Sequence, residues 1–142
     1  MKLKSIHLYC LAGMFLWPML AQAQLAVTVS PPQITGQKAV VELKMKNNLA
    51  KKVESAHAVC FLLDDQGKMI GRSTKWVIGG TKNRPALEPK KDTTFNFVVT
   101  SPNSSGFTTT NLTAKVSFTR VVLEGGNLAN VTKDVSVTAA MQ

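Results

Sequence analysis

Six basic residues and one tryptophan gather within residues 72–91, and this is the part of the sequence best equipped to bind a ligand. The same segment holds a single acidic residue, Glu88. An aromatic ring beside cations suits an anionic polymer or a glycan, through stacking and charge contacts. In the alternative interpretation, the tryptophan packs in the core and the cations are solvated in a loop. The candidate ligand contacts are Arg72, Lys75, Trp76, Lys82, Arg84, Lys90 and Lys91.

Catalysis would need a nucleophile with a base, a carboxylate pair or a metal cluster. His57 is the only histidine after residue 23, so a Ser-His-Asp triad would depend on it and a histidine-rich zinc site is excluded. Asp64 and Asp65 could bind calcium, but a calcium loop supplies about six oxygen ligands, whereas Asp64-Asp65-Gln66-Gly67 is typical of a turn. We therefore predict no catalytic, cofactor-binding or metal site and no enzyme. A small hydrolase that uses His57 is the rival hypothesis.

The elements that would position these residues are β-strands, because apolar and polar residues alternate along the chain after residue 23. Val41, Leu43 and Met45 alternate with charged residues, which gives that strand one core face and one solvated face. Residues 55–63 are apolar on both faces, as in a central strand. The other predicted strands cover about residues 25–30, 69–78, 94–99, 112–118 and 131–137.

About seven short strands separated by turn signals predict an all-β fold, an immunoglobulin-like antiparallel β-sandwich. A small barrel is the alternative. We expect Phe61 and Phe95 to lie on facing strands in the core, and Cys60 to be buried because it interrupts an apolar run. Val131, Val135 and Val137 mark the last strand.

The N-terminus has the pattern of a cleavable signal peptide. Lys2 and Lys4 precede a largely apolar stretch, and Ala21-Gln22-Ala23 supplies the small residues that a signal peptidase recognises. The sequence therefore predicts a signal peptide at residues 1–23 and a single mature domain at residues 24–142, with no transmembrane segment. We expect export to the periplasm or to the extracellular medium.

The chain is basic, with seventeen Lys and Arg residues, eight Asp and Glu residues and a net charge of +9. Residues 1–23 contain two of the basic residues and no acidic one, so the mature net charge is near +7. Such a balance favours contact with anionic surfaces or polymers but names no ligand. We expect an unknown protein or an anionic envelope component as partner, and no nucleic acid.

One segment resembles a known family. Phe61-Leu62-Leu63-Asp64-Asp65 is similar to the F-x-L-Y-D motif that names a group of bacterial exported β-sandwich domains, with Asp64 in the place of the tyrosine. Leu87-Glu88-Pro89 is similar to the L-x-P-G element of that group, with Lys90 in the place of the glycine. The likeness spans roughly residues 40–99. It implies an exported, often accessory, β-sandwich domain without catalytic residues to carry over.

Together these features predict an exported, non-enzymatic binding or structural module of the cell envelope. Two modes of recognition stay open. A sheet edge or face could take a protein partner by strand addition. Alternatively, the basic 72–91 loop could make the chain an anionic-polymer-binding domain.

Overall fold

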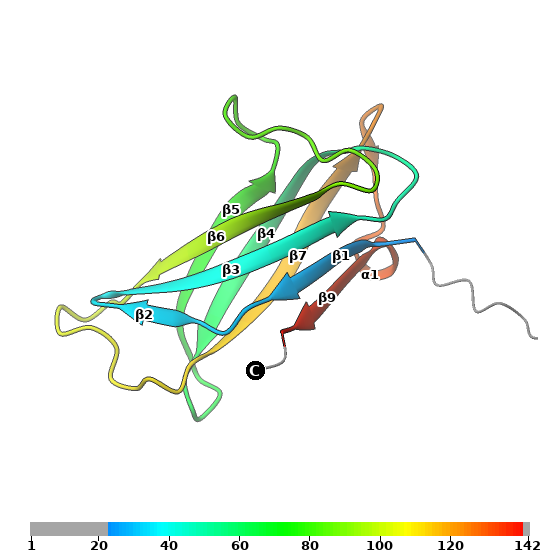
Figure 1. Ribbon diagram of the computed structural model, residues 1–142. Coiled ribbons are helices and arrows are strands. Elements are labelled where there is room, and N and C mark those ends of the chain that lie inside the picture. Colours follow the sequence, from blue (N-terminus) through cyan, green and yellow to red (C-terminus); the bar gives the residue numbers. More distant parts are fainter. Residues whose placement is uncertain (1–22, 141–142) are drawn as a thin grey trace, which may run out of the picture.

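The computed structural model describes residues 23–140, which form two β-sheets packed face to face (Figure 1). The first, which we call the β3 sheet, contains β1 (Leu25–Val29), β2 (Gln33–Thr35), β3 (Lys38–Asn47), β6 (Asp92–Thr100) and β9 (Val135–Ala139). The second, the β4 sheet, contains β4 (Val53–Leu63), β5 (Met69–Ile78), β7 (Thr113–Leu123) and β8 (Asn127–Leu128). One helical turn, α1 (Val131–Asp134), joins β8 to β9. The predicted immunoglobulin-like β-sandwich is confirmed.

In the β3 sheet, β6 pairs antiparallel along one edge of β3, while β1 and β2 share the other edge. Pro31 and Pro32 separate β1 from β2, because proline has no N–H to give to a ladder. The last strand, β9, extends this sheet by pairing with β1, and that pair is parallel. The first and last strands within residues 23–140 therefore lie side by side in one sheet.

In the β4 sheet, β4 lies between β5 and β7 and pairs antiparallel with both. The β4–β5 turn is closed by Asp64, whose carboxylate accepts hydrogen bonds from the backbone N–H groups of Gln66 and Lys68 at 2.9 and 2.8 Å. The far side of β7 pairs with β8 only at Val122 and Leu123. The Val121 carbonyl also accepts from the Ala129 N–H at 2.9 Å. Residues 113–120 of β7 therefore form an edge with no strand partner among residues 23–140.

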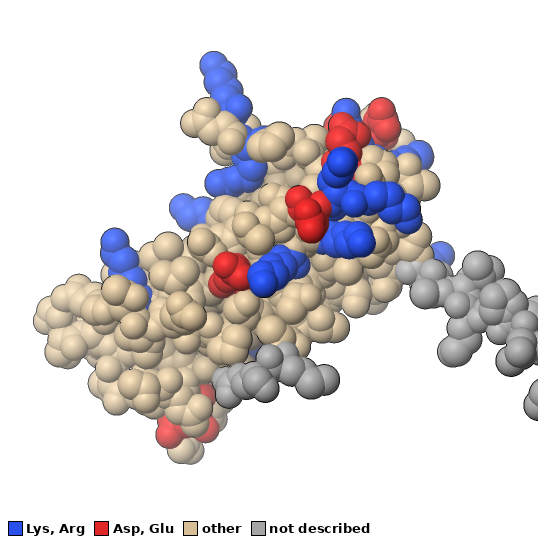
Figure 2. Space-filling view, in the orientation of Figure 1, with Lys and Arg blue, Asp and Glu red and all other residues tan. Residues whose placement is uncertain are grey.

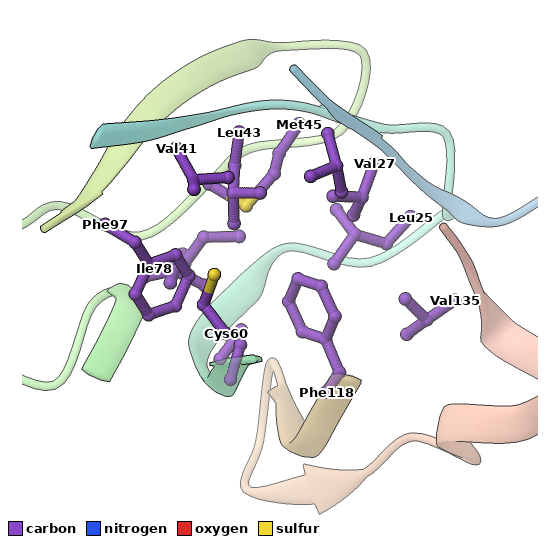
Figure 3. Packing of buried hydrophobic residues seen from close by; sticks show 14 of the residues in the cluster. Leu25, Val27, Val41, Leu43, Met45, Cys60, Ile78, Phe97, Phe118 and Val135 are labelled. Atoms are coloured by element: carbon purple, nitrogen blue, oxygen red, sulfur yellow. The ribbon is translucent and has the colours of Figure 1, made fainter. Parts of the chain in front are cut away.

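The core lies between the sheets (Figure 3). Val41, Leu43 and Met45 of β3 point inward and are fully buried, as their alternation predicted. They meet Cys60 and Phe118 from the opposite sheet. Cys60 is a free thiol with no exposed area, so its predicted burial is confirmed.

The prediction that Phe61 belongs to the core is wrong. The inward positions of β4 in its second half are Ala58, Cys60 and Leu62, which are all fully buried. Phe61 lies between them in sequence and therefore points from the opposite face of the strand, where it is half-buried. Phe95 does face inward and packs against the edge of the core, although it is only partly buried.

The predicted last strand is also shorter than expected. Val131 lies in α1, and β9 begins at Val135. Asn130 caps this helical turn: its side chain accepts hydrogen bonds from the N–H groups of Thr132 and Lys133. The turn carries the chain from the β4 sheet across to the β3 sheet.

The predicted signal peptide falls almost entirely outside the described residues, because residues 1–22 are not among them. β1 begins at Leu25, one residue beyond the predicted mature start at Gln24. No helix within residues 23–140 has the length and apolar character needed to span a bilayer.

Candidate binding surfaces

The seven candidate contacts of residues 72–91 are divided among different surfaces. On β5, Arg72 and Trp76 are four residues apart and share the outer face of the β4 sheet. Lys75 pairs instead with Ala58, an inward-facing residue, and its side chain is exposed at this outermost strand of the sheet. Two of the three candidate contacts on this strand therefore lie on one face.

The loop after β5 holds two more of the candidates. Arg84 is committed to internal contacts: its guanidinium donates to the backbone carbonyl of Trp76 and lies 4.7 Å from the centre of the Phe95 ring. These two contacts, a hydrogen bond and a cation–π interaction, hold the loop against β5 and the start of β6. Lys82 is exposed.

Lys90 and Lys91 lie directly before β6, which begins at Asp92 in the other sheet, and their backbones are bound to Asn47. The Lys90 N–H donates to the Asn47 carbonyl at 2.7 Å, and the Asn47 N–H donates to the Lys91 carbonyl at 3.0 Å. Figure 2 shows the outer face of this β3 sheet, where basic and acidic side chains are mixed. Lys44 and Glu42 on β3 form an ion pair there at 3.8 Å.

The outer face of the β4 sheet carries an aromatic pair. The rings of His57 and Trp76 meet edge to face, with centroids 4.9 Å apart and planes at 66°. His57 Nδ1 lies 2.7 Å from the Thr119 hydroxyl, which fixes the imidazole from the β7 side. Gly80 lies so close to the indole that a Cβ there would come within 2.5 Å of Trp76 Cγ, and its φ is +76°. The tryptophan is therefore held on the sheet surface, outside the hydrophobic core.

Basic side chains surround this pair in register. Phe61 lies between Arg72 of β5 and Lys115 of β7, directly opposite both. Further along, His57 lies between Trp76 and Arg120. These six residues come from three strands, and we call them the cationic face. Of the six, only Arg72 and Trp76 were predicted from the sequence as ligand contacts.

A bulge in β7 completes the face. Phe118 and Val121 both point into the core, so the two residues between them, Thr119 and Arg120, both turn outward. The register with β4 shifts at this point, between His57 and Ala58, because two residues of β7 oppose one of β4. Sequence alternation could not place Arg120 on this face without the bulge.

A second surface lies at the side of the sandwich between β7 and β9. It is a groove of about 410 Å³ that continues into a smaller hollow of about 180 Å³, and Val29, Ala114 and Ala139 line both. Val116 and Val137 add to its apolar lining, and Val137 is 39% exposed. We call this surface the β7–β9 groove.

The opposite side of the sandwich, between β5 and β6, is closed at its middle, and smaller hollows of about 230 and 270 Å³ lie toward its two ends. Gly71 of β5 approaches Val99 of β6 so closely that a Cβ would come within 2.6 Å of the valine Cγ1. Arg84 covers the same side from the loop through its contact with Phe95. The two sides of the sandwich therefore differ, and the groove belongs to the side where the sheets stand apart.

Asp64 and Cys60 both have structural roles in this fold. The Asp64 carboxylate is used by the turn it caps, and residues 23–140 contain no group of three metal-binding side chains. Burial raises the pKa of the Cys60 thiol to about 11, so at neutral pH it is protonated and unreactive.

Comparison with known proteins gives no match to a protein-family model or to a curated protein. Among solved structures, the chain is similar to a β-glucuronidase from glycoside hydrolase family 2, with 15% identity and a TM-score of 0.39. That match covers 80% of this chain and 10% of the other.

Proposed function

We propose that this chain is an exported, non-enzymatic binding module of the cell envelope, and that it takes an extended segment of a protein partner as an added strand along β7. The observation that carries the proposal is the unpaired edge of β7 over residues 113–120. Every second residue of that edge directs its N–H and C=O away from β4. The backbone of another strand can form hydrogen bonds with these groups, and sheet edges bind extended peptides in this way.

The groove beside this edge supplies the other half of such a site. An added strand presents alternate side chains to opposite faces, so one set would enter the β7–β9 groove and the other would face solvent. Ala114 and Ala139 are small and leave room for larger apolar side chains. Backbone pairing would then provide affinity, and the apolar groove would provide selectivity.

The path of the C-terminal segment explains why the edge is open. After β8 pairs for two residues with β7, the Asn130-capped turn takes the chain to the other sheet, where β9 pairs with β1. The Ala140 N–H donates to the Val29 carbonyl at 2.8 Å and continues that pairing. The segment that could have covered β7 is thereby held on the far side of the groove.

The export part of the proposal is supported by the sequence of residues 1–23. Removing them would take away no strand of the sandwich, since β1 begins at Leu25. N-terminal sequencing of material from the host envelope should give Gln24 as the first residue. A start at Met1 would contradict the compartment.

The proposal is tested by capture of partners from envelope extract, with one variant that places a charge in the groove. Val137→Lys should abolish capture, because a charge beside a free edge opposes strand pairing. The matched control is Val98→Lys, which makes the same change at a similarly exposed valine (45% against 39%). Val98 lies on β6, at the edge of the β3 sheet that is far from β9. Equal capture by the two variants would exclude the groove.

The rival hypothesis, a hydrolase built on His57, has its own test. The chain and its His57→Ala variant would be screened against generic ester, amide and glycoside substrates. Turnover that disappears in the variant would contradict a non-enzymatic function. We expect no turnover from either, because the His57 ring is engaged with Trp76 and Thr119.

A further inference from the structure

The cationic face is a second surface that adjoins the β7–β9 groove: Phe61 and Lys115 line both, whereas Arg72, Trp76 and Arg120 lie outside the groove. We propose that it binds an anionic polysaccharide, whose sugar rings lie over the aromatic side chains while its acidic groups reach Arg72, Lys115 and Arg120. The exported location proposed above is used only to choose between kinds of polymer. The strand-addition site can fail without affecting this inference.

Charge is the first argument. The three cations of the face are exposed, and β5 and β7 contain no acidic residue at all. None of the three makes an ion pair within residues 23–140. The outer face of the β3 sheet is different, since basic and acidic side chains are interspersed on it (Figure 2). β4, which lies between β5 and β7, contributes one acidic residue, Glu54. The cations of β5 and β7 are therefore free to contact an anionic ligand.

The aromatic side chains are the second argument. Phe61 and His57 lie on β4 in the middle of the sheet, four residues apart, which places them about 13 Å from each other. Trp76 is fixed by Gly80, His57 and the Arg84 contact to its carbonyl. A ring already held in place loses little conformational freedom when a ligand packs against it. The face therefore combines prearranged rings with mobile charged side chains.

The spacing of the cations decides between polymers. Arg72 and Lys115 are two strands apart, about 10 Å, and Arg120 is about 13 Å further along β7 or slightly more. Nucleic acid strands carry a charge at every nucleotide and are bound by dense basic grooves. Three widely separated cations instead match a polymer whose acidic groups are separated by neutral rings. Single-stranded nucleic acid is therefore an outcome of the test and not the proposal.

The experiment measures binding of the full chain to hyaluronate, in which charged and neutral sugars alternate, with uncharged dextran and a single-stranded thymidine oligonucleotide as comparison ligands. The decisive variant is the double substitution Arg72→Glu/Arg120→Glu. Its control is Lys38→Glu/Lys46→Glu, which changes the net charge by the same amount at two exposed lysines of β3. Both pairs lie outside the β7–β9 groove.

We expect hyaluronate to bind in a salt-sensitive manner and dextran not to bind. The Arg72→Glu/Arg120→Glu variant should lose at least about tenfold in affinity, and the control less than about twofold. A change in tryptophan emission on binding should be absent from the Trp76→Phe variant. Equal losses in the two double variants would overturn the site in favour of net charge. Oligonucleotide binding as tight as hyaluronate binding, with the same emission change, would overturn the choice of a polysaccharide.

Discussion

The backbone N–H of Lys90 donates to the carbonyl of Asn47 across 2.7 Å, and this bond fixes the start of β6 to the end of β3. Lys90 reaches it with a φ of +67°, the only positive φ among the non-glycine residues described. A left-handed conformation costs an ordinary residue about 1–2 kcal/mol. Position 90 is where the L-x-P-G element that this segment resembles has its glycine.

Replacing Lys90 by glycine should therefore stabilise the chain, by up to about 1 kcal/mol once the greater freedom of glycine in the unfolded state is subtracted. Lys91→Gly is the matched control, and it should destabilise, because Lys91 has no positive φ to relieve. Chemical unfolding of both variants checks the prediction. Destabilisation by Lys90→Gly would show that the conformation is not strained.

Asn47 should be one of the most sensitive polar positions. Its fully buried side chain donates to the Lys51 and Leu87 carbonyls at 3.0 Å each, and accepts from the Leu49 N–H at 2.9 Å. Asn47→Ala would leave the Leu49 N–H and the Lys51 carbonyl without these partners, while the Leu87 carbonyl would keep its bond from the Val53 N–H. We expect a cost of about 2–3 kcal/mol in unfolding free energy. Asn48→Ala, one residue away, should cost less than about 1 kcal/mol. Similar losses in the two variants would refute this role.

Truncation of two phenylalanines should lower the unfolding free energy by very different amounts. Phe97 is fully buried, so Phe97→Ala should cost about 3–5 kcal/mol. Phe61 lies on the cationic face, and Phe61→Ala should cost no more than about 1.5 kcal/mol, since it removes only part of a buried surface. Thermal unfolding of both variants gives the comparison. A larger loss from Phe61→Ala would place that residue in the core after all.

The buried Cys60 thiol should make stability depend on pH in alkaline solution. Its folded pKa is about 11, against an ordinary value of 9.0, so below pH 9 the thiol is protonated in both states. Above that pH the unfolded chain releases the proton while the folded chain keeps it. Unfolding therefore becomes easier, by on the order of 2–3 kcal/mol as the pH approaches 11.

Cys60→Ala lacks this titration and is the reference for other alkaline effects. Denaturant unfolding at pH 7, 9 and 10.5 should show the advantage of the unmodified chain over the variant shrinking as the pH rises. Parallel pH courses for the two would contradict the burial of a titrating thiol. At neutral pH, thiol reagents should label Cys60 only after denaturation.

Much of the sandwich was predictable because strand alternation is local information. Val41, Leu43 and Met45 alternate cleanly with charged residues, and the structure places all three in the core. The same reasoning failed for Phe61, because β4 is apolar on both faces and alternation does not say which set faces inward. The pairing partner of the last strand was not predictable either. A valine-rich strand signal does not reveal whether its partner is β7 or β1.

The surfaces were harder to predict than the fold. Successive side chains of a strand point to opposite faces of the sheet. Arg72 and Trp76 are four residues apart and share a face, whereas Lys75 is an odd number of residues from each and faces the other way, so the sequence could have separated them. Lys115 and Arg120 could not be found, because their place beside Phe61 and His57 depends on non-local register and on the bulge at Thr119. One local signal was available and missed: Asn130, which is a favoured helix cap, precedes α1.

Our central proposal is that residues 113–120 of β7 pair with a strand from a partner. Amide hydrogen exchange, measured on the free chain and on the chain bound to the partner captured from envelope extract, tests it most directly. In the free chain, alternate amides of this segment should exchange fast, since they have no acceptor on the open side. In the complex those amides should slow by at least about tenfold, while amides of β5 stay unchanged. A complex in which β7 exchanges as it does in the free chain would contradict the account.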